Sequence, residues 1–145
     1  MRLVLAFFFL SSVLPSIAQS AAPVPDYSGM YSFLREGEYI QISVENNGQV
    51  TGFISRYGDS DANKNSFVEQ FLQSGKLNGD HLSFTTKQMN GISFSFDGTI
   101  GRGPGKTTED EGYCVIRGTL IRLTTDAAKK TTQQTNEVEF KSFPK

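Results

Sequence analysis

Residue types that carry chemistry are sparse in this sequence, and the most complete pattern among them is an acidic one. Asp59, Asp61 and Asn63 supply side-chain oxygens at positions 1, 3 and 5 of a calcium-binding loop. Lys64 stands where that loop requires glycine, and Gln70 stands where its bidentate glutamate belongs. We therefore interpret the segment as a solvated loop, with a weak calcium site at Asp59, Asp61 and Asn63 as the alternative.

The other reactive groups lack the partners that catalysis or metal binding needs. Gly101–Thr107 contains Gly-Lys-Thr, but Ile100 replaces the first glycine of a phosphate loop and no helix-forming run follows. His81 is the only histidine and Cys114 the only cysteine, so a zinc site and an intramolecular disulfide are excluded. The Glu109–Glu111 run is interpreted as solvated charge. We expect no catalytic residue, no structural metal and no cofactor, and hence a protein that is not an enzyme.

Charge and the first residues of the chain indicate a compartment. The 145 residues carry 14 Lys and Arg against 15 Asp and Glu, and no basic patch favours nucleic acid or an anionic membrane. Arg2, an apolar run over Leu3–Leu14 and small residues around Ala18 and Ser20 form a signal peptide over 1–20. An uncleaved anchor is the alternative. We expect a secreted or periplasmic protein with no membrane span after cleavage.

The elements that position the remaining residues are strands joined by tight turns. In Glu38–Tyr57, apolar residues alternate with polar ones on both sides of Asn47-Gly48, which is typical of a β-hairpin. Asn78-Gly79 and Asn90-Gly91 repeat the signal. The predicted strands cover residues 27–34, the two arms of 38–57, 66–77, 81–87, 92–100, 112–124 and 137–143.

Three segments of the chain have less regular patterns than these strands. Residues 66–76 fit both a helical stripe and strand alternation, and the turn behind them favours a strand. Gly118 inside a long apolar run predicts a bulge or bend. Residues 125–136 lack an apolar face and are interpreted as a polar excursion.

Sequential hairpins predict an all-β fold: a single soluble up-and-down antiparallel β-barrel of about eight strands. Residues 21–26 form a flexible lead-in, and 27–145 form the barrel domain. A two-sheet sandwich is the alternative. An outer-membrane barrel is disfavoured because its strands need unbroken apolar outer faces, whereas these carry charges such as Arg56 and Arg122.

Two segments give the chain a family resemblance. Ser28-Gly29-Met30-Tyr31 and the hairpin arm Gly48–Phe53 resemble the opening of avidin-type barrels, which begin with Gly-x-Trp; lipocalins share that start. The resemblance implies an eight-stranded barrel in which Tyr31 takes the place of the tryptophan at the barrel floor. The family's ureido-binding asparagine and tyrosine match Phe33 and Ile54, and the chain has no tryptophan. The resemblance therefore argues against biotin.

Eight strands enclose a space that is either filled by side chains or wide enough for one small ligand. We expect a binding module for a small apolar or amphipathic molecule. The candidate ligand-binding residues are Tyr31, Phe33, Tyr39, Phe53 and Tyr57. One alternative is a protein-interaction or inhibitor module that uses loops 59–65 and 101–111 on a filled barrel. Another is an isomerase-like enzyme, for which a buried carboxylate such as Asp97 beside a cavity would be the sign.

Overall fold

The protein folds as a meander of eight antiparallel strands. The computed structural model describes residues 25–145, so the predicted signal peptide and residues 21–24 of the lead-in lie outside the described part. None of the described elements is a helix of the length and apolarity that a membrane crossing requires. The strands are β1 (Gly29–Ser32), β2 (Tyr39–Val44), β3 (Val50–Tyr57), β4 (Phe67–Asn78), β5 (His81–Thr86), β6 (Ile92–Arg102), β7 (Cys114–Thr125) and β8 (Thr131–Lys141).

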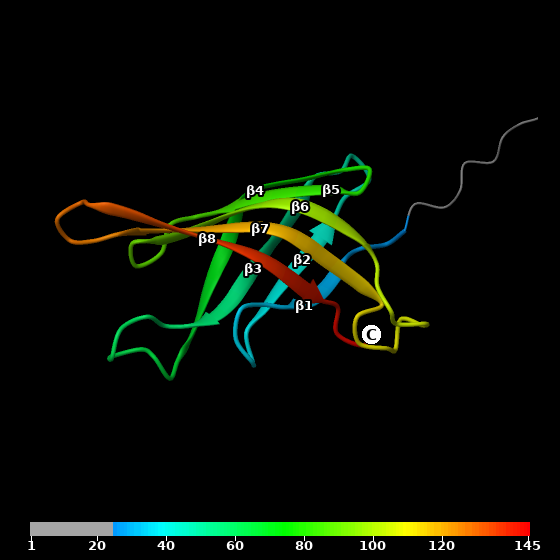
Figure 1. Cartoon of the computed structure of the whole chain (residues 1–145), viewed down its shortest axis with the longest axis horizontal. Coiled ribbons are helices and arrows are strands. Elements are labelled where there is room, and N and C mark those ends of the chain that lie inside the picture. The colour runs from blue at the N-terminus through cyan, green and yellow to red at the C-terminus, as the bar shows by residue number, and fades with distance from the viewer. Residues whose placement is uncertain (1–24) are drawn as a thin grey trace, which may run out of the picture.

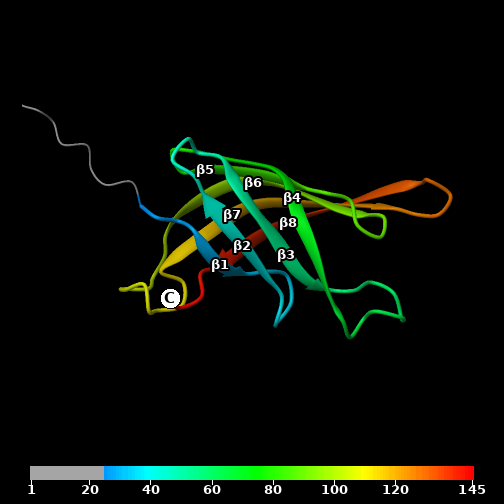
Figure 2. The same cartoon turned by 180° about the vertical axis from the view of Figure 1, so that it is seen from behind.

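Each strand pairs with its neighbours in sequence, and the sheet curls until its first and last strands meet. The order is β1 to β8 without a crossover (Figure 1). In the view from behind, β2, β3 and β4 lie across β6, β7 and β8 (Figure 2). Tyr31 forms a bridge with Ser142, and the Phe143 amide donates to the Met30 carbonyl at 2.9 Å. The predicted all-β fold with eight up-and-down strands is confirmed. The sheet is strongly curled, and β1 and β8 contact each other at one end.

The three Asn-Gly pairs lie in the β2–β3, β4–β5 and β5–β6 turns, as predicted. Their glycines have φ angles of +80° at Gly48, +64° at Gly79 and +76° at Gly91, and Asn90 also has a positive φ. Glycine adopts this left-handed backbone without the steric cost of a Cβ. At Gly91 a Cβ would also run into the Thr125 carbonyl oxygen. These turns set the register of the strands on either side.

The ambiguous segment 66–76 is strand, as the turn behind it favoured, and belongs to β4, which has a register shift between Leu72 and Ser74. One boundary differs from the sequence prediction. Strand β8 starts at Thr131, so residues 131–136 of the predicted polar excursion are strand. They pair with β7 in an unbroken ladder that includes Leu123 with Gln133. The prediction was wrong there because this hairpin is exposed to solvent, so its residues need not alternate between apolar and polar.

Of the bulge or bend predicted at Gly118, the bulge is absent. Gly118 pairs with Gly98 in a β6–β7 ladder that runs without a register shift, and the shift in the sheet lies in β4 instead. A Cβ on Gly98 or on Gly118 would meet the opposite backbone. The two glycines therefore let the central strands approach closely, which is the second physical reason for glycine inside a strand.

The inward-facing side chains fill one half of the barrel. Ile40, Ile54, Leu82, Ile100 and Ile116 are fully buried. Aromatic rings pack above them: Phe84 stacks on Phe96 with centroids 5.1 Å apart, and Phe140 lies 6.3 Å from Phe96. Cys114 is a buried free thiol in this core, which agrees with the interpretation of it as a small core residue.

Candidate functional site

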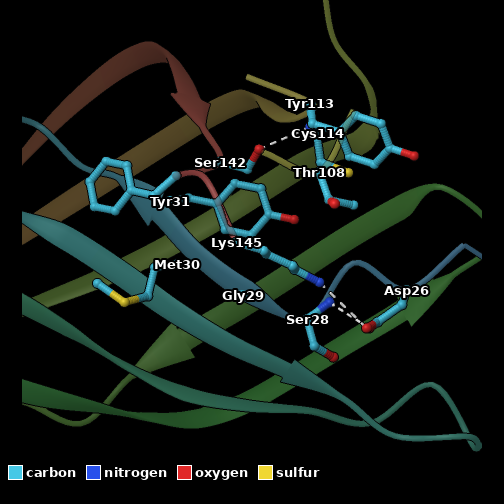
Figure 3. Close-up of a pocket in the computed structure, with 11 residues that line it drawn as sticks. Asp26, Ser28, Gly29, Met30, Tyr31, Thr108, Tyr113, Cys114, Ser142 and Lys145 are labelled. Carbon is cyan, nitrogen blue, oxygen red and sulfur yellow. Dashed lines mark hydrogen bonds and ion pairs between the residues drawn. The ribbon is translucent and has the colours of Figure 1, made fainter. Parts of the chain in front are cut away.

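The two ends of the barrel differ in how far side chains close them. At the end where the C-terminus lies, Tyr31, Cys114 and Ser142 pack together (Figure 3). The Tyr31 hydroxyl donates to the Tyr27 carbonyl at 2.7 Å, and burial raises the pKa of Tyr31 well above its usual value. The space left there is about 20 Å³, which is room for about one water molecule. The side chains around Tyr31 therefore leave no room for a ligand there. A separate hollow of about 550 Å³ lies outside them at the same end, between Tyr27, Val44 and Leu77.

The other end opens into a cavity of about 640 Å³. It is the end that carries the β1–β2, β3–β4, β5–β6 and β7–β8 loops, on the far side from the C-terminus (Figure 1). We call this space the mouth cavity. Its apolar lining consists of Phe33, Leu34, Phe94, Leu120 and Val138. Its polar lining consists of Arg35, Glu38, Arg56, Asp59, Lys64, Arg122, Gln134, Asn136 and Glu137.

A buried polar network built on Arg56 lies beside this cavity. Arg56 follows Val50, Gly52 and Ile54 on the inward face of β3, and only 3% of its surface is exposed. Its Nε donates to Gln70 Oε1 at 3.0 Å, and Gln70 Nε2 donates in turn to Thr86 Oγ1 at 2.9 Å. A buried charge is costly unless its hydrogen bonds are made, so this network holds the guanidinium in place.

The Arg56 guanidinium also contacts an aromatic ring and a carboxylate. Its Cζ lies 5.6 Å from the centre of the Phe94 ring, within the range of a cation–π interaction. Its Nη1 donates to the Tyr57 carbonyl at 3.2 Å and to Asp59. Its Nη2 is buried and has no hydrogen-bond partner within residues 25–145. Both N–H groups of this buried nitrogen are thus without a protein acceptor.

Asp59 joins two arginines from opposite parts of the sheet. It lies in the β3–β4 loop, and its second oxygen accepts from Arg122 Nη2 of β7 at 2.7 Å. Burial by itself would raise the pKa of Asp59, but Arg56 and Arg122 together hold that pKa below its usual value. One carboxylate therefore serves two guanidinium groups, which leaves the trio with a net positive charge.

A second ion pair forms the rim at the start of β2. Glu38 is buried, and its side chain pairs with Arg35 Nη2 at 2.7 Å. Its oxygens also accept from the backbone amides of Arg35 and Tyr57, each at 3.0 Å. These bonds tie the β1–β2 loop to the end of β3. Because Glu38 has its acceptors occupied, we assign it a structural part in shaping the cavity wall.

The structure places the five predicted ligand residues in three different locations. Phe33 lines the mouth cavity, with its ring centre 5.5 Å from that of Phe94. Tyr31 lies at the closed end. Tyr39, Phe53 and Tyr57 alternate with buried residues and lie on the outer face of β2 and β3. Contact of any of these five residues with a ligand stays a prediction.

The three outward aromatic residues belong to an aromatic stripe across β2, β3 and β4. Tyr39 contacts Phe53, Phe53 contacts Phe71, and Tyr57 stacks on Phe67 with ring centres 4.5 Å apart. Phe67 and Phe71 are each 51% exposed. We call these five residues the outer stripe. Cross-strand aromatic pairs stabilise a sheet, and an exposed apolar patch is also a surface for contact with another molecule.

The oxygens of the calcium candidate already have partners. Asp59 binds the two arginines, Asn63 Oδ1 accepts from the Ser60 amide and hydroxyl, and Asp61 pairs with Lys64 at 3.2 Å. Within residues 25–145 there is no group of three His, Cys, Asp or Glu side chains arranged to hold a metal ion. A calcium site at Asp59, Asp61 and Asn63 stays a prediction, in which calcium competes with these contacts.

Asp97, which the sequence analysis named as a sign of catalysis, lies outside the barrel. Its side chain is 73% exposed and pairs with His81 at 3.2 Å. The Gly101–Thr107 segment is a surface loop after β6, as interpreted, and no helix follows it. Among the chemistry-bearing residues singled out from the sequence, only Asp59 lines the mouth cavity.

The sequence reasoning did not assign Arg56, Phe94 and Arg122 to the site. The signal was present, because Arg56 occupies the next inward position after Val50, Gly52 and Ile54. A charged residue in phase with an apolar face has to meet either a buried partner or a cavity. Arg122 follows Ile116, Gly118 and Leu120 in the same manner.

These features define a class of architecture: an eight-stranded antiparallel barrel with a filled interior around Tyr31 and a partly charged open mouth at the other end. A scan against protein-family models found no match, and no curated protein matched the sequence. Solved structures do match. A crystal structure of rhizavidin covers 81% of this chain and 83% of its own, with a TM-score of 0.60 at 13% identity. A rhizavidin–biotin complex covers 79% and 98%, with a TM-score of 0.58 at 14% identity.

The predicted resemblance to avidin-like barrels is therefore confirmed at the level of the fold. At such identities the likeness shows the fold alone.

Proposed function

We propose that this protein is an exported binding module that holds a small apolar or amphipathic molecule in the mouth cavity and does not transform it. The observation that supports this most is the cavity itself, about 640 Å³ in volume. Ligand pockets have volumes of roughly 300–1,000 Å³, with mainly apolar walls and a few convergent polar groups. The volume lies in that range, and the lining combines an apolar wall around Phe94 and Leu120 with a polar wall around Arg56 that has more residues than such pockets usually carry.

The architecture of the neighbours supports the same proposal. Rhizavidin, which shares this fold, has been crystallised with biotin. The present chain lacks the residues that its resemblance to that family would require for biotin, as Phe33 and Ile54 show. The rhizavidin fold therefore supports a barrel that accepts a ligand, whereas the chemistry of the ligand is inferred from the mouth cavity of this chain.

Native mass spectrometry tests the proposal directly. The protein would be produced with its own N-terminus in a secreting host, purified after export, and incubated with a lipid and metabolite extract. We expect a retained small-molecule mass, and an intact mass that begins after Ala18 or Ser20. No retained mass from a broad extract would contradict ligand binding, and an unprocessed N-terminus would contradict export by a cleaved signal.

A pair of tryptophan variants locates the bound molecule. Asn136 lines the mouth cavity from β8, whereas the neighbouring Thr135 faces outward on the same strand. Asn136→Trp fills part of the cavity, and we expect it to reduce retention at least tenfold. Thr135→Trp adds the same side chain outside the barrel and is expected to leave retention unchanged. Equal effects would place the ligand elsewhere.

The outer stripe favours a second candidate function, contact with another protein. Phe67 and Phe71 are half-exposed on one face of β4 with Glu69 between them, and exposed apolar residues that group in this manner are typical of an interaction surface. Self-association is the simplest case. Sedimentation velocity of the protein and of the Phe67→Ser/Phe71→Ser double variant tests it: a dimer that the substitutions convert to monomer supports the candidate, and a monomer throughout contradicts self-association.

A further inference from the structure

The proposed small-ligand function leaves the chemistry of the ligand open, and the Arg56 side chain supplies a further constraint. Its Nη2 carries two N–H donors and is buried without a partner in the described part of the chain. Leaving a donor of a charged group unsatisfied in the protein interior destabilises the fold. Such a group in a cavity wall is where an acceptor of a bound molecule would be stabilised most.

The charges around the cavity point the same way. Four cationic side chains line it, Arg35, Arg56, Lys64 and Arg122, against three carboxylates, Glu38, Asp59 and Glu137. Arg35 is paired with Glu38 and Lys64 with Asp61, while the Glu137 carboxylate is turned toward the outer face, where it accepts from Thr119 Oγ1 at 2.6 Å. Asp59 is left to neutralise Arg56 and Arg122 together. One positive charge is therefore uncompensated on the side of the cavity where these arginines meet.

The apolar groups lie next to this positive charge. The Phe94 ring is in contact with the Arg56 guanidinium, and Phe33 and Leu120 continue the wall from there. A molecule that fits both parts has an apolar body and one anionic head. Resting on the proposed binding function, we propose that the ligand is an anionic amphiphile whose carboxylate, sulfonate or similar head binds Arg56 and Arg122 while its apolar body packs on Phe94 and Leu120.

Two fluorescent probes that differ by one charge test the inference. Anilinonaphthalene sulfonate carries a sulfonate, and N-phenylnaphthylamine has the same aromatic frame without it. We expect the anionic probe to bind about tenfold more tightly, a difference of about 1.4 kcal/mol, because its sulfonate can form charge-assisted hydrogen bonds that the neutral probe cannot form. Decanoate is expected to displace the bound probe, and decanol is expected to displace it much less.

Three single variants assign the selectivity to the proposed residues. Arg122→Gln removes a cavity charge at a partly exposed position, and we expect a loss of about tenfold for the anionic probe with little change for the neutral one. Arg117→Gln removes the same charge from the outer face of β7, where Arg117 pairs with Glu139 at 2.7 Å, and serves as the matched control. Asp59→Asn releases both arginines and is expected to strengthen binding of the anionic probe.

The outcomes separate failure of the inference from failure of the proposed function. If both probes bind with equal affinity and Arg122→Gln changes neither affinity, the cavity does not select ligands by charge and the inference is overturned. If Phe71→Ser lowers the anionic signal and Arg122→Gln does not, the probe lies on the outer stripe and the inference is overturned as well. If neither probe binds and the extract yields no mass, the proposed function fails together with the inference.

Discussion

Arg56 is the residue on which the mouth depends, because a charged group inside a barrel is stable only while its partners hold it. Gln70 is fully buried and provides the acceptor for Arg56 Nε, while its amide donates to Thr86, Lys87 and Ile92. The glutamine thus connects β3, β4, β5 and β6 in one plane of the barrel. Its side chain orders the polar wall of the cavity.

Gln70→Ala removes this connection. We expect the free energy of unfolding to fall by about 2–3 kcal/mol, because a buried charge loses its acceptor and three backbone or hydroxyl oxygens lose a donor. Gln41→Ala, at an exposed position of β2, is the matched control and is expected to change stability by less than about 0.5 kcal/mol. Urea unfolding monitored by circular dichroism measures both, and equal losses would mean that the network is not structural.

Asp59 predicts a particular dependence of stability on pH. Its folded-state pKa lies below the ordinary value of 3.8, so its contribution is fully present above that value and is lost as the pH falls through the folded pKa. The difference in unfolding free energy between the protein and Asp59→Asn should therefore be constant above about pH 5 and shrink below about pH 4. Calorimetry at a series of pH values checks this. A difference that grows toward acid would contradict the ion-pair assignment.

At the scale of elements, the turns are the features that local chemistry determines most strongly. Gly91 combines a φ of +76° with close approach to the Thr125 backbone, whose amide donates to the Gly91 carbonyl at 2.7 Å. We expect Gly91→Ala to destabilise the protein by about 1–3 kcal/mol through backbone strain alone. Gly101→Ala is the control, because Gly101 has open space around its Cβ position. Thermal unfolding measures the Tm of both variants. Equal decreases in Tm would contradict strain in this turn.

The same elements show why the sequence predicted the fold better than the site. The Asn-Gly pairs and the alternation in β2, β3 and β6 are local signals, and each was confirmed. The start of β8 was not predicted, because its pairing with β7 depends on long-range contacts. Polar residues such as Gln133 give no local signal of that pairing. Outward Tyr39 and Phe53 resembled pocket residues, because aromatic residues favour both pockets and exposed strand faces.

The site escaped prediction for a related reason. Arg56 and Arg122 are 66 positions apart in the sequence but close in space, because both pair with Asp59. No local sequence pattern predicts that two arginines on distant strands lie next to each other inside a barrel. What the sequence did contain was a charged residue at an inward position of each strand. Such a residue marks a buried network or a cavity, and here Arg56 belongs to both.

At the scale of the whole molecule, the two halves of the barrel differ along its axis. The interior around Tyr31, Phe84 and Phe96 is filled by side chains, whereas the half around Arg56 and Phe94 is open and charged. A barrel filled throughout would favour a scaffold for surface loops. An open half lined by aromatic rings and arginines favours a ligand, and the outer stripe offers a separate surface on the other side of the same strands.

The most direct test of the central claim is an amide NMR titration of the protein with decanoate. Binding in the mouth cavity predicts chemical-shift changes in the segments that surround it, which are residues 33–38, 56–59, 120–122 and 134–138. The outward positions Phe53 and Phe71 and the closed end at Tyr31 should change little. Shifts confined to the outer stripe, or no shifts at concentrations where the anionic probe is displaced, would contradict a ligand site in the mouth.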